Sequence, residues 1–403
     1  MKNYKTKRNQ WIRSSVLHIP AALLLLSIQN LTAVPAEPTT VKVRQPDGSH
    51  IKIQLRGDER RSWNQTPDGF AVQKRADGAW VYSREESGRL TPSLHLVGRS
   101  NPRALNIRKP NIQRLLQTAD ADNRRTKGGP RPQIITSGTI KHLVIMVNYT
   151  DLSFIKSVSE MDDVFNKTGH DASGAKGSVR DFYLEVSDNS VTVESTLAGP
   201  VTVDNPFAYY GATDPGTGRD IRRRELAEDA VDKLEQSGFD FAPFDGDSDG
   251  SVDGLTILHA GGGQEVGGND ENYIWSHAWA MTTVKTYDGV SLWKYNASPE
   301  LYSGTTITRI GVICHELGHH LFSLPDLYDT NGGSQGLGQF CLMSGGTWNA
   351  GGHGPAHMNV WCKQRLGWVT PTLISTDGNF SIGQIETTGN AYKLHGQFSD
   401  ANE

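Results

Sequence analysis

The stretch that decides the fold is Val312-Ile313-Cys314-His315-Glu316-Leu317-Gly318-His319-His320-Leu321. His315 and His319 are four residues apart, so on an α-helix they lie on one face about one turn from each other. Two neutral imidazoles at that spacing can hold one zinc ion. Glu316 then lies beside the metal, where it can take a proton from a water molecule that the metal holds. We therefore expect a zinc-bearing helix that begins near Thr308 as its N-cap.

Because this pattern is short, a chance match on an amphipathic surface helix is the alternative, and a third metal ligand is the first test. A catalytic zinc site needs three protein ligands and leaves one position for water. No Glu occurs between Leu317 and Ile385, which nearly excludes a Glu on a later helix. Pro325 breaks the helix, and Asp326 follows it directly. Asp326 is therefore the predicted third zinc ligand.

The first 36 residues differ in composition from all that follows. A basic start, Lys2–Arg13, precedes an apolar run, Val16–Leu31, and the small residues Ala33 and Ala36 come next. This order is typical of a secretory signal peptide, and the run is short for a membrane span. The alternative is an N-terminal membrane anchor, and either one takes the chain out of the cytosol. We expect residues 1–36 to be a signal peptide, the protein to be secreted, and no stable membrane span to remain after its removal.

The net charge of −4 hides an asymmetry within the 403 residues. Residues 37–132 carry 19 Lys and Arg against 10 Asp and Glu, whereas residues 133–403 carry 16 against 34. A basic unit followed by an acidic one predicts that the first docks on the second. The basic unit has no helical or aromatic-interleaved basic stripe, so nucleic acid is not an expected partner.

Residues 37–132 are expected to be a small β-rich propeptide with a basic processing linker. Short apolar runs alternate with Asp-Gly turns, and the unit ends in the Gly- and Pro-rich segment Asn123–Pro132. Such a segment is exposed and easily cut, although an ordinary interdomain linker is the alternative. The unit contains no cysteine, so a propeptide thiolate cannot block the zinc. We expect it to inhibit the enzyme within the same chain by occlusion or through another ligand.

The remaining chain is expected to hold a catalytic domain, residues 133–370, and the start of a C-terminal β unit, residues 371–403. We expect that the sequence is truncated within this β unit or that a longer C-terminal extension is absent. Leu255–His259 is a candidate strand for binding extended substrate along its edge. Further segments follow the periodicities of buried strands or amphipathic helices. Strands are predicted at His142–Val147, Asn379–Ile382 and Ala391–Leu394, and helices at Lys176–Val186 and Ile221–Gln236.

Residues 245–253, with the sequence DGDSDGSVD, resemble a calcium loop, because oxygen-bearing side chains occupy alternate positions and Gly occupies the sixth. An EF-hand has a bidentate acid at its twelfth position, which here is Thr256, so Asp253 would have to close the site. The alternative is a solvated acidic turn. The predicted calcium ligands are Asp245, Asp247, Asp249, Ser251 and Asp253.

Two motifs after the zinc-bearing helix point to a family. Cys341-Leu342-Met343-Ser344-Gly345-Gly346 resembles the methionine turn beneath the zinc of metzincin-type peptidases, with Met343 24 residues after His319. This turn, the segment HELGHHLFSLPDLYD, and residues 177–183, 249–260 and 356–368 together resemble the M6 family of secreted metallopeptidases, the immune inhibitor A group. The N-terminal unit is similar to that family's propeptide. The resemblance implies an α+β, metzincin-like domain with a mixed sheet and an active-site helix, and a zinc endopeptidase secreted as a precursor.

The chain departs from the family pattern in one place. The family has Gly three residues and Asp six residues after the second His, whereas this chain has Phe322 at the first position and Asp326 at the seventh. One residue is thus inserted in the turn, and Asp329 is the alternative third ligand. Separately, the three cysteines leave at least one thiol unpaired, and the sequence does not establish whether Cys341 and Cys362 are bridged.

The expected function is hydrolysis of peptide bonds in extracellular proteins, with Glu316 as the general base. The metal would hold the tetrahedral oxyanion, with help from a phenol such as that of Tyr328. The alternative is a secreted metal-binding or adhesive protein that has lost catalysis. The intact His315, Glu316 and His319 argue against that alternative.

Overall fold

The structure is a computed structural model and describes residues 34–117, 129–130, 132–329 and 334–394. Most of the predicted signal peptide, up to residue 33, lies outside the described residues, as do residues 118–128 and 131 of the predicted processing linker. Within the part that is described, no helix combines the length and the apolar character needed to cross a membrane. The domain limits at residues 36, 132 and 370 stay predictions.

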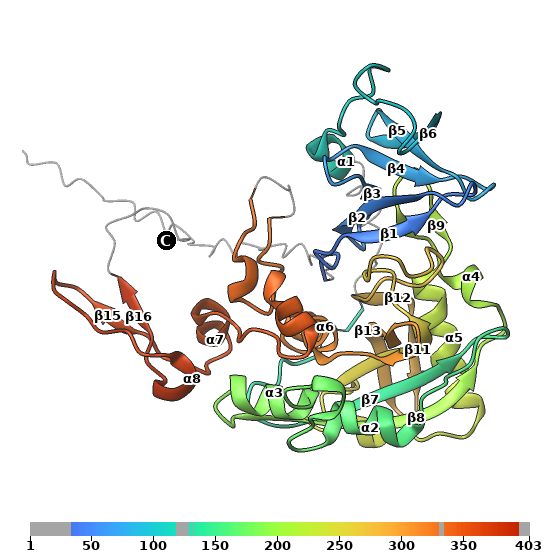
Figure 1. The fold of residues 1–403 in the computed structure, drawn as a ribbon. Helices are drawn as coiled ribbons and strands as arrows, with labels where there is room; N and C mark the ends of the chain where they lie inside the picture. Colours follow the sequence, from blue (N-terminus) through green and yellow to red (C-terminus); the bar gives the residue numbers. More distant parts are fainter. Residues whose placement is uncertain (1–33, 118–128, 131, 330–333, 395–403) are drawn as a thin grey trace, which may run out of the picture. The chain divides into compact units, whose positions relative to one another are not determined.

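Six strands form the sheet of the N-terminal unit, each pairing in antiparallel fashion with its neighbours in chain order (Figure 1). Along the second strand Ile51, Ile53 and Leu55 are buried while intervening residues are more exposed, which gives the sheet one apolar face. The unit is β-rich, as predicted. Its elements are β1 (Val41–Arg44), β2 (His50–Asp58), β3 (Arg61–Gln65), β4 (Ala71–Lys74), β5 (Trp80–Glu86), β6 (Arg89–Leu96) and α1 (Ile112–Gln117).

A tight hairpin joins β2 to β3 through the two residues Glu59 and Arg60. Gly57 has a φ of +94°, and a Cβ atom there would lie 1.8 Å from the carbonyl oxygen of Arg61, so no other residue fits. Asp58 Oδ1 accepts hydrogen bonds from the backbone N–H groups of Arg60 (3.0 Å) and Arg61 (3.1 Å). The Asp58 side chain thereby fixes the turn with one of its oxygens and keeps the other for a partner outside it.

The second sheet is mixed, in the order β12-β13-β11-β7-β8. β11 pairs in parallel with β7 and β13, β7 pairs in parallel with β8, and β12 is antiparallel to β13. The predicted mixed sheet is confirmed, but β11 has a strand on each side, so the prediction that it offers a free edge to substrate is wrong. The strands are β7 (Gly138–Asn148), β8 (Val191–Thr202), β11 (Gly254–Gly262), β12 (His277–Tyr287), β13 (Val290–Ser303) and β14 (Thr306–Ile307), which pairs with β13.

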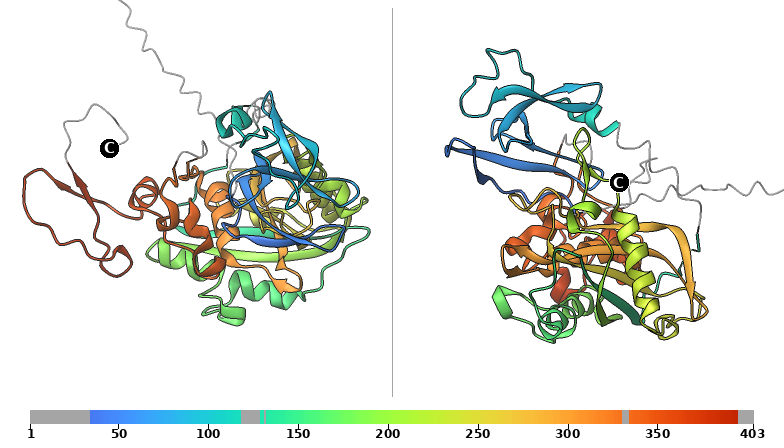
Figure 2. Two further views of the ribbon diagram at one scale, coloured as in Figure 1. Left: turned by 45° about the horizontal axis from the view of Figure 1, so that its top comes forward. Right: turned by 90° about the vertical axis from the view of Figure 1, so that its right-hand side faces the viewer.

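Helices cover both faces of this sheet (Figures 1 and 2). Leu143, Ile145 and Val147 of β7 belong to a core with α5 (Arg223–Gln236), whereas Val144 and Met146 belong to a second core on the other face. A strand covered on both faces needs a continuous apolar run, which is why His142–Val147 predicted one. The second core is shared with α2 (Val158–Asn166), α3 (Val179–Val186) and α6 (Ile310–Phe322).

Helix α6 carries the HExxH stretch, and every residue in it except His320 is buried. It begins after Arg309, whose side chain makes no capping bond, and the Thr308 N–H is bonded to the carbonyl oxygen of Glu300 instead. The prediction of Thr308 as N-cap is therefore wrong. The helix ends at Phe322 and is followed by the C-cap residue Ser323, whose φ is 49°. The N–H groups of Ser323 and Leu324 donate to the carbonyl oxygens of His319 (3.0 Å) and Gly318 (3.2 Å). The chain then turns sharply before Pro325.

The C-terminal part contains a short parallel pair of strands, β15 (Thr372–Ile374) and β16 (Tyr392–Leu394). β16 confirms the strand predicted at Ala391–Leu394, whereas the strand predicted at Asn379–Ile382 is wrong: β16 pairs with β15 instead, and Ile382 is 75% exposed. The remaining elements among the described residues are α4 (Phe207–Tyr210), β9 (Thr213–Asp214), β10 (Arg219–Asp220), α7 (Val360–Arg365), α8 (Ile385–Thr388) and the 3₁₀ helices at Ala172–Gly174, Ala242–Phe244, Gly338–Phe340 and Gly345–Gly352.

Candidate metal centre

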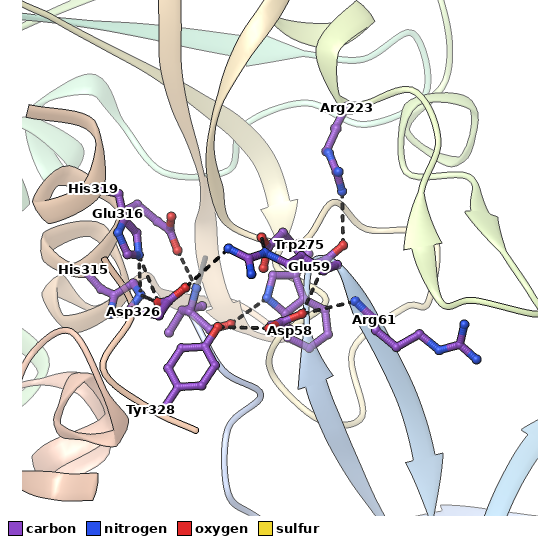
Figure 3. A network of polar contacts seen from close by, with 12 residues as sticks. Asp58, Glu59, Arg61, Arg223, Trp275, His315, Glu316, His319, Asp326 and Tyr328 are labelled. Carbon is purple, nitrogen blue, oxygen red and sulfur yellow. Dashed lines mark hydrogen bonds and ion pairs between the residues drawn. The ribbon is translucent and has the colours of Figure 1, made fainter. Parts of the chain in front are cut away.

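Three side chains converge at the C-terminal half of α6 (Figure 3). The Nε2 atoms of His315 and His319 are 2.9 Å apart, and Asp326 Oδ1 lies 3.3 Å and 3.2 Å from them. The side chains are at most 3% exposed. The structure thus brings together the two predicted histidines and the predicted carboxylate. Asp329 lies outside this group, because its Oδ2 accepts a hydrogen bond from the Ser334 N–H at 2.7 Å.

The hydrogen bonds of the two imidazoles decide which nitrogen carries the proton. His315 Nδ1 lies 2.8 Å from the Leu342 carbonyl oxygen, and His319 Nδ1 lies 2.6 Å from that of Leu324. A carbonyl oxygen only accepts, so each Nδ1 is the donor and each Nε2 presents a lone pair. Two nitrogen lone pairs and a carboxylate oxygen therefore face one another. A cation resolves this arrangement, and two imidazoles with one carboxylate are ligands that fit zinc.

The electrostatics of Asp326 agree with a cation site. Neither of its carboxylate oxygens has a hydrogen-bond donor among the described residues. Burial alone would raise the pKa of Asp326, but positive charge on the neighbouring imidazoles, that of His319 foremost, brings it well below its usual value. With the imidazoles neutral, a bound cation would supply that positive charge. Burial lowers the pKa of His319, which favours the neutral, metal-binding form of the ring.

Glu316, the predicted general base, lies beside the two histidines (Figure 3). Burial, and next the charge of Glu59, raise the pKa of its carboxyl group well above the ordinary value. Its Oε1 accepts a hydrogen bond from the backbone N–H of Val34 at 2.8 Å. Its Oε2 has no partner among the described residues, so this carboxylate still has an acceptor for a water molecule.

The predicted methionine turn packs against α6. Met343 is fully buried, and a Cβ atom added to Gly318 would lie 2.6 Å from its Sδ. The turn also orients the ligands, because the Leu342 carbonyl oxygen holds His315 and the Met343 carbonyl oxygen accepts from the Leu327 N–H at 2.7 Å, next to Asp326. The turn therefore supports two of the three predicted ligands from one short segment.

The cysteines are not bridged: Cys314, Cys341 and Cys362 are free thiols, all buried. A hydrogen bond with the Cys362 thiol lowers the pKa of Cys341. The sequence did not establish whether Cys341 and Cys362 form a disulfide; in the structure they are neighbouring free thiols.

The tip of the β2–β3 hairpin reaches this centre (Figure 3). Tyr328, two residues after Asp326 in the chain, donates from its hydroxyl to Asp58 Oδ2 at 3.0 Å. The Glu59 side chain is fully buried, pairs with Arg60 at 3.4 Å, and has no hydrogen-bond donor among the described residues. Arg60 Nη2 lies 3.9 Å from Asp326 Oδ2. The charge asymmetry of the sequence predicted docking between the two units, but it did not show that carboxylates of the basic unit lie at the contact.

A second segment, Val34–Glu37, lies beside the same centre; it spans the end of the predicted signal peptide and the start of the N-terminal unit. The indole N–H of Trp275 donates to the carbonyl oxygen of Val34, and that of Trp348 donates to Pro35, both at 2.9 Å. The Glu37 N–H donates to the Glu265 carbonyl oxygen, also at 2.9 Å. Sequence reasoning missed these residues, because short apolar and indole side chains carry no motif.

The predicted calcium loop is partly assembled. Carboxylate oxygens of Asp245, Asp247 and Asp249 lie within 4.8 Å of one another. Asp253 instead uses both oxygens to accept from the backbone N–H groups of Lys141 (2.8 Å) and Gly246 (2.9 Å). Ser251 is buried beside the loop and forms a β-bridge with Ser291. The structure thus brings three of the five predicted ligands together, and calcium binding stays a prediction.

Comparisons with known proteins place the metal centre within a matched region. Residues 158–369 match the family described as Immune inhibitor A peptidase M6, catalytic domain. The chain is 30% identical over 276 residues to the pre-pro-metalloprotease PrtV of Vibrio cholerae serotype O1. The aligned region covers 57% of this chain and 30% of that protein. It is 32% identical over 276 residues to Immune inhibitor A of Bacillus thuringiensis subsp. alesti, covering 56% of this chain and 39% of that protein. The matches thus span well under half the length of these curated relatives.

Proposed function

The chain belongs to the immune inhibitor A family of M6 peptidases, and from that premise we propose that it is a zinc-dependent endopeptidase that is secreted as a precursor. The observation that carries the proposal is the convergence of three acceptors, His315 Nε2, His319 Nε2 and Asp326 Oδ1, within 3.3 Å of one another. Glu316 beside them keeps one oxygen without a partner among the described residues. This set of groups supports hydrolysis of peptide bonds in proteins and peptides.

Zinc, when bound, supplies a Lewis acid that polarises the scissile carbonyl and acidifies water. His315 and His319 are held in the metal-binding tautomer by the Leu342 and Leu324 carbonyl oxygens. Glu316 accepts a proton from the attacking water and delivers it to the leaving amine. The hydroxyl of Tyr328 donates to the oxyanion once Asp58 no longer holds it.

The N-terminal unit is proposed to keep the precursor inactive by occupying the substrate site. Two contacts support this, the one between the hairpin tip at Asp58–Arg61 and Tyr328 and the one between Glu37 and Glu265. The backbone of Glu37 bonds to Glu265, just after the end of β11, as an extended peptide substrate would. Activation then requires a cut in the predicted linker, Asn123–Pro132, and release of the unit.

The experiment compares the wild-type enzyme, after removal of residues 37–132, with Glu316→Ala, using casein cleavage and zinc content. We expect zinc in both proteins and cleavage by the wild type alone. Glu194→Ala is the control, because this glutamate is 57% exposed and pairs with Lys141 on the surface. Zinc in both proteins with cleavage by neither would instead favour an inactive metal-binding or adhesive protein.

A further inference from the structure

Two buried thiols touch each other where two segments beside the metal centre meet. Cys341 begins the predicted methionine turn, and Cys362 lies in α7, 21 residues further along the chain. Neither side chain has exposed surface. The Cys362 thiol donates a hydrogen bond to the Cys341 sulfur, so the two sulfur atoms are neighbours in the folded chain.

Hydrogen bonds hold the two segments in place around these sulfurs. The N–H of Leu342, the residue after Cys341, donates to the His357 carbonyl oxygen at 3.2 Å. Asn359 Oδ1 accepts from the Cys362 N–H at 3.0 Å and so fixes the start of α7. A disulfide needs two cysteines whose side chains face each other from neighbouring segments, and this packing provides them.

The sulfur of Cys341 is also placed for reaction. The backbone N–H groups of Met343 and Asn359 bond to it in addition to the Cys362 thiol, and such donors favour the thiolate, the form that attacks a disulfide. Cys314 in α6 receives no such hydrogen bond within the part of the chain that the structure describes. The odd number of cysteines thus divides into one reactive pair and one thiol outside it.

The pair lies next to a contact that orients a predicted zinc ligand. Leu342, directly after Cys341, holds His315 Nδ1 through its carbonyl oxygen at 2.8 Å. The turn pairs with no strand among the described residues, so its position depends on packing and on single hydrogen bonds. A covalent link from Cys341 to α7 would hold this carbonyl oxygen more firmly, because a closed loop has fewer conformations available to it.

We propose that Cys341 and Cys362 are the site of a disulfide, formed as the chain folds outside the cytosol, and that this bridge fixes the predicted methionine turn against α7. The structure describes the pair in its reduced form. Disulfides form and persist in oxidising compartments, so the inference rests on the secretion that is part of the proposed function. Cys314 remains a thiol.

The reaction is thiol–disulfide exchange with an external disulfide. The thiolate of Cys341 attacks one sulfur of that disulfide, which forms a mixed disulfide and releases the other sulfur as a thiolate. The thiolate of Cys362 then attacks the Cys341 sulfur, forms the Cys341–Cys362 bond and releases the second external thiolate. Two electrons pass to the external disulfide, and the two protons that the cysteines lose end on its two thiols.

The first test needs no enzyme activity. The secreted precursor is alkylated with N-ethylmaleimide in guanidinium chloride and digested with trypsin. All three cysteines fall in one tryptic peptide, Ile310–Lys363, because no Lys or Arg lies inside it before its last residue. We expect one maleimide group on this peptide, located on Cys314 by fragmentation, and three groups when the protein is reduced before alkylation. Three groups without reduction, or a single group on either member of the pair, would overturn the proposal.

The same digest separates the bridge from the proposed secretion. If the chain is not secreted, that part of the proposed function fails, and the digest is made of precursor refolded in a buffer of oxidised and reduced glutathione. One maleimide group on Cys314 again supports the bridge, and three groups overturn it.

The second test measures what the bridge does to the metal centre, in the oxidised precursor and after reduction by a trialkylphosphine. Reduction should lower the melting temperature by about 5–10 °C, because it opens a loop of about 20 residues. It should also weaken zinc binding about tenfold, because the Leu342 carbonyl oxygen then holds His315 less firmly. Equal melting temperatures and equal zinc affinities in the two redox forms would refute the proposal that the bridge fixes the turn.

Two variants complete this comparison. Cys362→Ala should not respond to the reductant, because it has no bridge to lose. The matched variant Cys314→Ala removes a buried thiol outside the pair and should respond as the wild type does. A response of Cys362→Ala equal to that of the wild type would refute the assignment. If the activated enzyme cleaves nothing, the proposed function fails, while alkylation, melting temperature and zinc affinity still decide the bridge.

Discussion

The hydroxyl of Tyr328 donates a hydrogen bond to Asp58 Oδ2 at 3.0 Å, joining the turn that carries Asp326 to the tip of the β2–β3 hairpin. The same phenol is the group that we propose for oxyanion stabilisation. One side chain would thus hold the N-terminal unit in the precursor and serve substrate after activation. The contribution of Tyr328 to latency can be measured in the precursor, and its contribution to catalysis in the activated enzyme.

Tyr328→Phe in the activated enzyme should lower kcat by about 100-fold, the effect of losing one oxyanion donor, and leave KM nearly unchanged. Steady-state kinetics on a fluorogenic peptide measure both constants. Tyr392→Phe, in the distant strand β16, serves as the control. A rise in KM with unchanged kcat would show that the phenol binds substrate only in its ground state.

Asp326→Asn should weaken zinc binding by at least about 100-fold, because it removes a predicted ligand. Mutation of a residue that only hydrogen-bonds to a metal ligand already lowers metal affinity by about 10- to 100-fold. Titration against a chelating dye measures the affinity. Asp329→Asn should bind zinc as the wild type does, because Asp329 is bonded to Ser334 away from the histidines. The reverse result would assign the third ligand to Asp329.

Gly318→Ala should destabilise the protein by about 1–3 kcal/mol, because the new Cβ atom would meet Met343 Sδ at 2.6 Å in a packed core. Urea unfolding measures the change. Met343→Ala creates a cavity and should also destabilise the protein, by about 2–5 kcal/mol. The double variant should lose less than the sum of the two, since the cavity accepts the added methyl group. Strict additivity would show that Gly318 and Met343 do not share a contact.

Acid should destabilise the fold through buried neutral histidines. Burial lowers the pKa of His142 and the pKa of His277 from the ordinary value of 6.5 to about 3. Between those values the unfolded chain binds more protons than the folded one, so the free energy of unfolding falls as the pH falls from 6.5 towards 3. Each histidine contributes about 1.4 kcal/mol per pH unit.

His142→Gln should therefore flatten the dependence of unfolding on pH by about one proton. Urea unfolding at several pH values between 4 and 8 gives the slope. His50→Gln, at an exposed position of β2, is the control and should leave the slope unchanged. An equal slope in His142→Gln and the wild type would mean that His142 is protonated in the folded state.

Calcium at millimolar concentration should raise the melting temperature of the wild type if residues 245–253 bind it. Asp247→Asn should abolish the rise, because Asp247 is one of the three clustered carboxylates. Asp204→Asn, at a surface aspartate that is 76% exposed, should keep it. A wild-type melting temperature that ignores calcium would identify the loop as a solvated acidic turn.

Local patterns were sufficient for elements whose periodicity matches their surroundings. The four-residue spacing of His315 and His319 follows from the helical repeat, and the apolar run His142–Val147 follows from a strand covered on both faces. The predictions that failed depended on neighbours. The prediction of a free edge on β11 was wrong because β13, later in the chain, pairs beside it. The prediction of a strand at Asn379–Ile382 was wrong because this segment pairs with no strand in the part of the chain that the structure describes.

By itself, the sequence determined the helix that carries His315 and His319, the predicted methionine turn and a candidate third ligand, because each is a matter of spacing within a few dozen residues. Only the tertiary structure decided between Asp326 and Asp329 as the carboxylate beside the histidines, since the path of the turn after Phe322 depends on packing against Met343. It also decided what meets Glu316. Val34 lies 282 residues away in sequence, so only tertiary packing brings its backbone to Glu316.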